Sequence, residues 1–131
     1  MSWKPSAIEI EGVQQLAAPK RYTYLVKRFA DEEQIWNVRN SDRWVLAGDD
    51  SGRQGVPIWP HEDFARLAAT DAWTGCQPEP ISLEAWLARW IPGMERDNRF
   101  VAVFPTPNDK GVAVEPSAFA SDLRRAVQDY Q

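Results

Sequence analysis

His61, the only histidine of the chain, is the first residue to consider for chemistry. A histidine acts as a general base when a carboxylate orients its ring and a nucleophile lies within hydrogen-bond reach. Asp49, Asp50 or Asp63 could orient the ring, and Ser51 or Cys76 could supply the nucleophile. Their spacing does not bring these groups together, and the chain has neither a Gly-x-Ser-x-Gly elbow nor a glycine-rich phosphate loop. The residue types allow a small hydrolase-like enzyme that uses His61 with Asp49 or Asp50, but no motif supports it, so this is the alternative hypothesis and not the main one.

Metal-ligating residues are too few to predict a metal site. One histidine and one cysteine cannot form the usual zinc ligand sets within one chain. Asp49 and Asp50 could bind a hard cation, but a calcium loop carries several more oxygen ligands at alternating positions. The two acids adjoin glycines in a predicted loop at 48–52, which is typical of turn chemistry. The sequence predicts no metal and no other cofactor.

Structural roles can also explain the histidine and the cysteine. His61 precedes Glu62 and Asp63, and acids in the first turn favour a helix start because the helix dipole is positive there. A histidine at this place is expected to bond the backbone or a carboxylate. Cys76 has no helix N-terminus or cation beside it that would activate its thiol, so we expect it to be buried.

Prolines fix the backbone around the histidine. The run 56–64, Val-Pro-Ile-Trp-Pro-His-Glu-Asp-Phe, contains two prolines that cannot both lie inside a helix. Its first half is therefore extended, and its acidic half begins a helix. We expect a rigid corner that presents Trp59 and His61. A corner of this kind is either a packing device or the rim of a binding site.

Trp59 and Trp73 are the tryptophans that hydrophobic periodicity constrains least. Partly exposed tryptophans are frequent binding anchors, and loops carry function more often than the scaffold does. The predicted binding surface combines the 48–54 loop, the corner at 59–61 and the segment 73–80. Its candidate binding residues are Asp49, Asp50, Trp59, His61 and Trp73.

Composition limits the class of partner. The chain has 131 residues and a formal net charge of −4, so it lacks the basic field that binds nucleic acid. Its one basic concentration, at 20–28, is expected to be a solvated helix face. The sequence shows no apolar signal segment and no run of about 20 apolar residues that could span a membrane. With a single cysteine, we predict a cytoplasmic protein without nucleic-acid or membrane partners.

Hydrophobic periodicity predicts the helices and strands. Apolar residues recur at helical spacing in 83–91, where Pro92 and Gly93 are expected to stop or kink the helix. Pro57 confines a predicted strand, 55–59, to an edge or a bulge. The predicted helices are 6–17, 19–32, 61–70, 83–91 and a last one from 116, and the predicted strands are 34–39, 44–47, 55–59, 100–104 and 111–115.

The order of these elements, ααβββααββα, predicts an α+β fold. The connections between the first three strands are too short for parallel crossovers, and segment 73–80 is predicted to be irregular. We therefore expect one five-stranded, mainly antiparallel sheet with helices packed on it. The length fits a single domain over residues 1–131, with residues 1–18 as a candidate N-terminal extension that is loosely attached.

Four short sequence motifs resemble those of a known family. They are Trp44-Val-Leu-Ala-Gly-Asp-Asp-Ser-Gly52, Val56-Pro-Ile-Trp-Pro-His61, Trp90-Ile-Pro-Gly93 and Val101-Ala-Val-Phe-Pro-Thr-Pro107. In this order they are similar to the bacterial family called domain of unknown function 2750, over about residues 20–130. The resemblance implies a small bacterial cytoplasmic protein, and it implies no activity and no catalytic residues.

A non-enzymatic module that binds another protein is the main functional prediction. It depends on the missing catalytic set and on the rigid proline corner beside aromatic residues. The hydrolase-like alternative stays open. A third hypothesis, an immunity or antitoxin partner, is a special case of protein binding.

Overall fold

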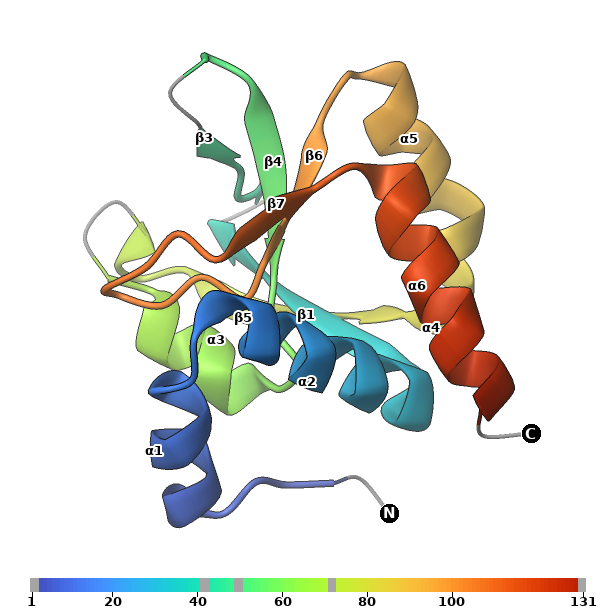
Figure 1. Cartoon of the computed structure of the whole chain (residues 1–131). Coiled ribbons are helices and arrows are strands. Elements are labelled where there is room, and N and C mark those ends of the chain that lie inside the picture. The colour runs from blue at the N-terminus through green and yellow to red at the C-terminus, as the bar shows by residue number, and fades with distance from the viewer. Residues whose placement is uncertain (1–2, 41–42, 49–50, 71–72, 130–131) are drawn as a thin grey trace.

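A computed structural model describes residues 3–40, 43–48, 51–70 and 73–129 (Figure 1). The helices are α1 (Ala7–Gln14), α2 (Ala18–Glu32), α3 (Glu62–Ala68), α4 (Leu83–Ala85), α5 (Ile91–Arg96) and α6 (Pro116–Asp129). The strands are β1 (Gln34–Asn40), β2 (Arg43–Trp44), β3 (Ala47–Gly48), β4 (Gln54–Ile58), β5 (Gln77–Ser82), β6 (Phe100–Val103) and β7 (Val112–Val114). This mixture of helices and strands confirms the α+β class.

The strands form two sheets, so the prediction of a single five-stranded sheet is wrong. One sheet has the order β2-β1-β5 and the other has the order β3-β4-β6-β7. The segment predicted as one strand, 44–47, is divided between them, because β2 pairs with β1 whereas β3 pairs with β4. β4 and β6 run parallel, and the other pairs are antiparallel. Figure 1 shows that the two sheets run in different directions.

β5 occupies much of the segment that was predicted to be irregular. It pairs with β1 along its whole length and forms the outer strand of its sheet. Pro78 and Pro80 are two residues apart, so the backbone positions that lack an N–H lie on the same side of the strand. Prolines are tolerated in an edge strand whose N–H side faces away from the partner. Two prolines at this spacing are therefore compatible with a strand.

β4 lies inside its sheet, so the prediction that Pro57 marks an edge strand or a bulge is wrong. β3 is too short to reach Pro57. The backbone of the next residue, Ile58, faces β6, so the backbone of Pro57 faces the space beyond the end of β3. There the Pro57 carbonyl accepts a hydrogen bond of 2.6 Å from Asn37 Nδ2. One step further, Trp59 forms a bridge with Trp36 of β1.

The predicted corner at 56–64 is confirmed. β4 ends at Ile58 and α3 begins at Glu62. The helix predicted at 83–91 does not stop at Pro92, because α4 continues through a π-helical segment, Trp86–Trp90, into α5. Proline cannot donate to the carbonyl one turn earlier, and the wider π-turn changes the hydrogen-bond register just before it. The apolar face therefore continues to Met94, which is buried.

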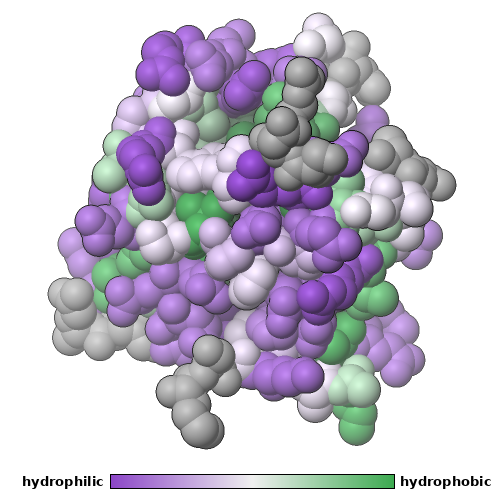
Figure 2. Space-filling view, turned by 180° about the vertical axis from the view of Figure 1, so that it is seen from behind, coloured by the Kyte–Doolittle hydropathy of each residue, from purple (hydrophilic) through white to green (hydrophobic). Residues whose placement is uncertain are grey.

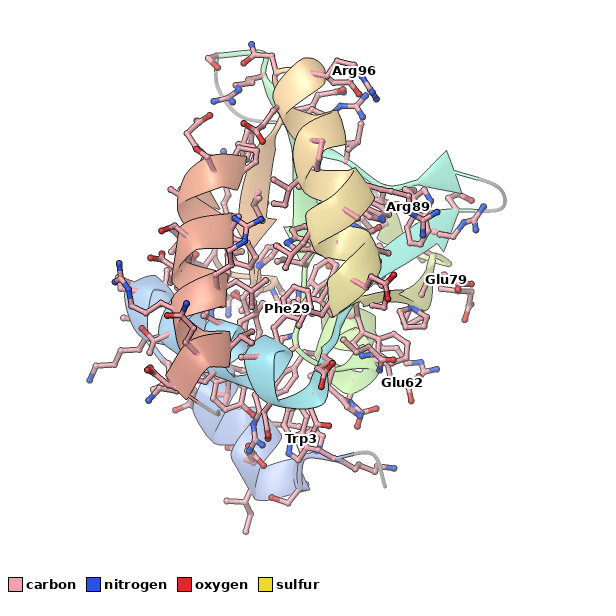
Figure 3. The ribbon with its side chains drawn as sticks, turned by 90° about the vertical axis from the view of Figure 1, so that its right-hand side faces the viewer. Trp3, Phe29, Glu62, Glu79, Arg89 and Arg96 are labelled. Atoms are coloured by element: carbon pink, nitrogen blue, oxygen red, sulfur yellow. The ribbon has the colours of Figure 1, made fainter. Side chains whose placement is uncertain are left out.

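Three aromatic rings form the centre of the core between the helices. Phe29 of α2 packs against Trp86 at a centroid distance of 6.0 Å, and Trp86 packs against Phe119 of α6 at 5.8 Å. All three side chains are 0% exposed. Figure 3 shows Phe29 between α6 and the α4–α5 helix. Full burial of a large apolar side chain contributes about 1.5–3 kcal/mol, so this cluster holds α2 and α6 against the π-helical segment.

The segment before α2 contacts the rest of the molecule through polar and aromatic groups. Tyr24 of α2 donates a hydrogen bond of 2.6 Å to Glu9 of α1, and Arg28 pairs with the same carboxylate at 3.2 Å. The Arg28 guanidinium lies 4.0 Å from the ring centroid of Trp3. Val13 of α1 is buried. These contacts place α1 across one side of α2.

Candidate functional site

Three of the five predicted binding residues can be located. Asp49 and Asp50 lie outside the described residues, so their role stays a prediction. Trp59 is 0% exposed, the His61 side chain is 12% exposed, and Trp73 is half-buried. The three rings therefore do not face a common solvent-open surface. They are nevertheless near one another, because Trp59 contacts Trp73 and lies two residues before His61.

Trp59 supports the neighbouring loops from inside. Its ring packs edge-on against Trp73 at a centroid distance of 5.8 Å. Its Nε1 donates a buried hydrogen bond of 2.8 Å to the carbonyl of Pro105, in the loop that follows β6. A buried tryptophan needs such an acceptor because an unpaired indole N–H is costly away from water. Trp59 thereby fixes the positions of Trp73 and Pro105.

His61 caps α3. Its Nδ1 accepts a hydrogen bond of 3.1 Å from the backbone N–H of Asp63. An accepting Nδ1 requires a neutral ring with its proton on Nε2. The Asp63 carboxylate is 3.5 Å from the same nitrogen and would form an ion pair only with a protonated ring, so the two interactions exclude each other. The structure thus shows the helix-start role expected for this histidine.

The hydrolase-like alternative gains no support from the described residues. Cys76 is buried. Ser51 lines a pocket whose lining does not include His61. Aromatic rings border the imidazole instead, with Trp3 at a centroid distance of 5.4 Å and Trp36 at 6.3 Å. Neither candidate nucleophile is thereby placed beside His61.

An apolar pocket of about 410 Å³ lies beside Trp73, and we call it the Trp73 pocket. It lies on the four-stranded sheet, on the side away from Val101 and Val103, which belong to the main core. α5 and α6 lie on the other side of that sheet (right in Figure 1). The pocket is lined by Leu46, Ala47, Gly48, Trp73, Phe100, Ala102, Pro105, Lys110, Gly111 and Ala113.

Small residues at alternating strand positions make the floor of the Trp73 pocket. Ala102 of β6 and Ala113 of β7 are cross-strand partners, and each lies between two valines. Because side chains alternate across a strand, the valines and the alanines face opposite sides of the sheet. Ala47 of β3 extends this floor opposite Gly55. Methyl groups leave a hollow where larger side chains would fill the sheet face.

Two glycines shape the walls. Gly55 lies under Phe100, since a Cβ at this glycine would be 2.3 Å from the phenyl ring. Gly111 has φ +80, and a Cβ there would be 2.3 Å from the carbonyl oxygen of Val103. Glycine tolerates both the positive φ and this close backbone approach. The loop between β6 and β7 can therefore turn tightly over one end of the pocket.

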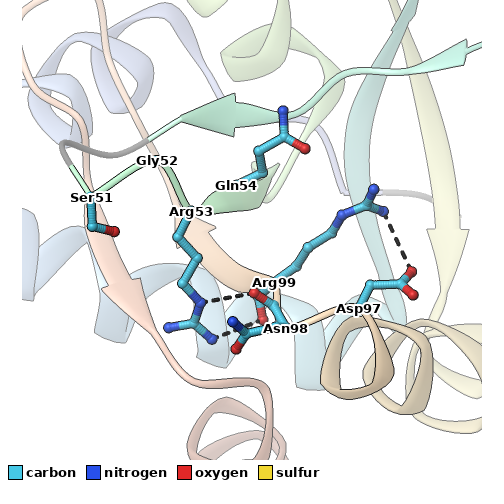
Figure 4. Close-up of a pocket in the computed structure, with 7 residues that line it drawn as sticks. All are labelled: Ser51, Gly52, Arg53, Gln54, Asp97, Asn98 and Arg99. Carbon is cyan, nitrogen blue, oxygen red and sulfur yellow. Dashed lines mark hydrogen bonds and ion pairs between the residues drawn. The ribbon is translucent and has the colours of Figure 1, made fainter.

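A second, polar pocket of about 500 Å³ lies at the start of β4 (Figure 4). Arg53 Nε donates to the carbonyl of Asn98 at 2.9 Å, and the guanidinium pairs with Glu115 at 2.6 Å. The hydrogen bond from Arg53, followed by its charge, lowers the pKa of the Glu115 carboxyl. These contacts join β4 to the turn before β6 and to the start of α6. Because the Arg53 guanidinium is engaged in these structural contacts, we favour the Trp73 pocket as the functional site.

Seen from behind, the molecule is mainly hydrophilic, with hydrophobic residues in small patches between purple ones (Figure 2). Large exposed apolar patches usually mark interaction sites. The hydrophobic patches on this face are small, so we expect recognition to occur at pockets. Among the described residues no group of three or more His, Cys, Asp or Glu could hold a metal ion. Within the same residues, no helix is both long and apolar enough to cross a membrane.

Sequence reasoning identified Trp73 and the neighbouring loop but missed most of the pocket. The lining residues Ala102 and Ala113 carry no polar chemistry, so a search for reactive groups passes over them. The signal that could have found them is the repeated word Val-Ala-Val in the two strands of one predicted hairpin. Side chains alternate along a strand, so this pattern on two paired strands predicts that the valines face the core and that the alanines leave a hollow on the opposite face.

The two sheets, the covering helices and the apolar pocket define a small α+β domain. The family model described as "Protein of unknown function (DUF2750)" matches residues 22–123. The protein belongs to the DUF2750 family, as the sequence resemblance indicated. The match includes both sheets and all the residues that line the Trp73 pocket, whereas α1 precedes it. Searches of curated proteins and of solved structures find no match.

Proposed function

We propose that this protein is a non-enzymatic module that binds another protein, and that the Trp73 pocket receives an apolar side chain of the partner. The observation that carries this proposal is the apolar pocket of about 410 Å³ on the sheet face. Its volume lies within the range of about 300–1,000 Å³ that is typical of ligand sites. Buried aromatic or aliphatic anchors dominate the energy of protein interfaces.

The lining chemistry favours a protein partner over a small metabolite. Among the described residues that line the pocket, Lys110 alone has a charged side chain. Small-molecule sites usually combine an apolar lining with several polar groups that fix the orientation of the ligand. An apolar side chain needs none of these groups, because the rest of the partner supplies its orientation. Its burial would contribute about 1.5–3 kcal/mol.

The proposed setting is the bacterial cytoplasm. Cys76 is free and buried, and an unpaired cysteine of this kind is typical of proteins from reducing compartments. This setting would make the partner another cytoplasmic protein.

Selection of peptides from a random displayed library tests the proposal. We expect selected peptides to share an apolar residue and to shift the NMR signals of Ala47, Trp73 and Ala113. Ala113 is exposed and lines the pocket, so Ala113→Trp should fill it and weaken peptide binding at least tenfold, or about 1.4 kcal/mol. Ala118 is equally exposed but lies on α6, and Ala118→Trp should leave binding unchanged.

Circular dichroism and thermal unfolding would establish that both variants fold. The proposal is wrong if the library yields no peptide that shifts signals of the pocket residues. It is also wrong if Ala113→Trp binds the selected peptides as well as Ala118→Trp does.

A further inference from the structure

The segment 43–48 forms an outer edge of both sheets. β2 stands at the end of the order β2-β1-β5, and β3 stands at the end of the order β3-β4-β6-β7. Val45 N–H donates to the Val38 carbonyl at 3.1 Å, which makes these two residues a hydrogen-bonded pair. The adjacent antiparallel pair, Trp44 with Arg39, is therefore a non-hydrogen-bonded one. The backbone N–H and C=O of Trp44 consequently point away from β1, toward the outer edge.

A groove of about 660 Å³, which we call the Trp44 groove, lies along the same segment. Leu46 lines both this groove and the Trp73 pocket, so the two hollows are neighbours along the edge. The Trp44 groove is lined by Trp44, Leu46, Val56, Arg89, Trp90, Gly93, Met94, Asp97 and Arg99.

Aromatic packing holds the walls of the Trp44 groove. Trp44 meets Trp90 edge-on at a centroid distance of 4.9 Å, and the Arg39 guanidinium lies 4.9 Å from the Trp44 ring. Trp90 stacks in turn on the buried Trp86 at 5.9 Å. The π-helical segment therefore presents a fixed Trp90 to the groove, with Arg89 beside it.

The charged side chains of the groove favour an anionic group. Arg99 pairs with Asp97 at 3.7 Å, which balances one positive charge. Arg89 is exposed and has no hydrogen bond or ion pair with another described residue. Figure 3 shows Arg89 at the outer side of the α4–α5 helix. One positive charge is thus available beside an apolar wall, in a chain whose formal net charge is −4.

We infer that the partner binds as an extended segment that adds a strand along 43–48, with an apolar side chain in the Trp73 pocket and an acidic side chain at Arg89. This inference rests on the proposed function. Edge-strand addition supplies main-chain hydrogen bonds, and pockets for alternate side chains supply specificity. Trp44 lines the groove and Ala47, three residues later, lines the Trp73 pocket, and the two hollows lie on opposite faces of the edge. At about 3.3 Å per residue these positions are about 10 Å apart, so the acid lies about three residues from the anchor, on the opposite side of the partner strand.

Charge variants of the protein and of the peptide test the acidic contact. A peptide from the selection above is compared with a version in which glutamine or asparagine replaces the acid. We expect the neutral version to bind about fivefold more weakly at low salt. Arg89→Glu should weaken the acidic peptide by about tenfold and leave the neutral version unchanged. Arg124→Glu, an exposed change on α6, is the matched control and should have no effect.

Methylation of the peptide backbone tests the added strand. A methyl group on one peptide nitrogen removes one main-chain donor and leaves the side chains in place. We expect tenfold or greater losses at alternate positions and small effects between them, because strand hydrogen bonds alternate along the chain. The amide signals of Trp44 and Leu46 should shift on binding.

Each negative result has a distinct meaning. The inference falls if the selected peptides show no acidic residue near the anchor, if Arg89→Glu leaves their affinity unchanged, or if backbone methylation has no alternating effect. Should Ala113→Trp still block the same peptides, the proposed function stands without the inference. If Ala113→Trp blocks nothing, both fall together.

Discussion

At the scale of single residues, one side chain of the predicted corner, Trp59, supports the candidate site from behind, whereas His61 supports the neighbouring helix. Trp59 is fully buried, yet both partners of its indole ring, Pro105 and Trp73, line the Trp73 pocket. His61 fixes the start of α3 through its Nδ1. A buried residue can therefore determine the shape of a site without contacting a ligand, because it fixes the positions of the residues that line the site.

The capping role of His61 leads to a stability prediction. His61→Ala removes the acceptor for the Asp63 N–H, and loss of a side-chain cap costs about 0.5–2 kcal/mol. His61→Asn keeps an acceptor at the cap position and should recover most of that loss. The measurement is the free energy of unfolding in urea, compared among the natural protein and the two variants. Equal losses in the two variants would show that the ring contacts with Trp3 and Trp36 matter more than the cap.

Two half-buried phenols predict a loss of stability at alkaline pH. Tyr22 donates to Asp122 at 2.5 Å and Tyr24 donates to Glu9 at 2.6 Å. Burial, followed by these carboxylates, raises the pKa of both phenols above the ordinary value. The folded state then holds the phenol protons more tightly than the unfolded state does. Their contribution is complete below the unfolded pKa of about 10 and is lost as pH rises through the folded pKa.

We therefore expect the free energy of unfolding to decline above about pH 10, more steeply for the natural protein than for a Tyr22→Phe, Tyr24→Phe double variant. Urea unfolding at a series of pH values measures the two slopes. The double variant keeps every other titratable group of the protein, so it is an internal control. Identical slopes would refute the part assigned to the phenols.

At the scale of elements, local periodicity explains what the sequence could predict. Helix α2 and the hairpin of β6 and β7 have their own apolar pattern and turn residues, and both are found where they were expected. The division at Val45 and Leu46 could not be predicted, because it depends on which distant strand each half pairs with. β5 was missed because Pro78 and Pro80 indicate a loop unless the free edge of β1 is known.

The candidate site was predictable in part for a similar reason. The sequence indicated Trp73 and the loop that starts at Gly48, and both border the Trp73 pocket. It also indicated Trp59, whose burial follows from a bridge with Trp36 that no local pattern reveals. The floor of alanines comes from strands far along the chain, so its shape exists only once the sheet forms.

The loop that covers the pocket predicts opposite effects for two glycine variants. Gly111→Ala places a Cβ 2.3 Å from a backbone oxygen at φ +80, and strain of this kind costs about 1–3 kcal/mol. Gly12 lies in α1 with open space around its Cβ position, so Gly12→Ala should stabilise the helix by about 0.5–1 kcal/mol. Thermal unfolding of both variants is the measurement. A neutral Gly111→Ala would mean that the loop between β6 and β7 can move away from Val103.

At the scale of the whole molecule, the two sheets share one core. Buried residues from both sheets and from α2, α3 and α6 belong to a single apolar cluster. The sheets are also joined directly, since Trp36 and Trp59 exchange two backbone hydrogen bonds of 2.9 Å. Asn37 adds its side-chain bond to the Pro57 carbonyl beside that bridge. Elements that share a core and a backbone joint are expected to unfold in one cooperative transition.

Asn37 gives the test of this joint. Its side chain is 0% exposed, and Asn37→Val leaves the buried Pro57 carbonyl without its donor. An unsatisfied buried polar group costs about 1–3 kcal/mol, and we expect the lower part of that range because the Asn37 Oδ1 is itself unpaired within the described residues. Asn108→Val, at an exposed loop position, should change stability by less than about 0.5 kcal/mol. Urea unfolding followed by both tryptophan fluorescence and circular dichroism should give one coincident transition for each variant. Separate transitions in Asn37→Val would instead show that each sheet unfolds independently once the joint is broken.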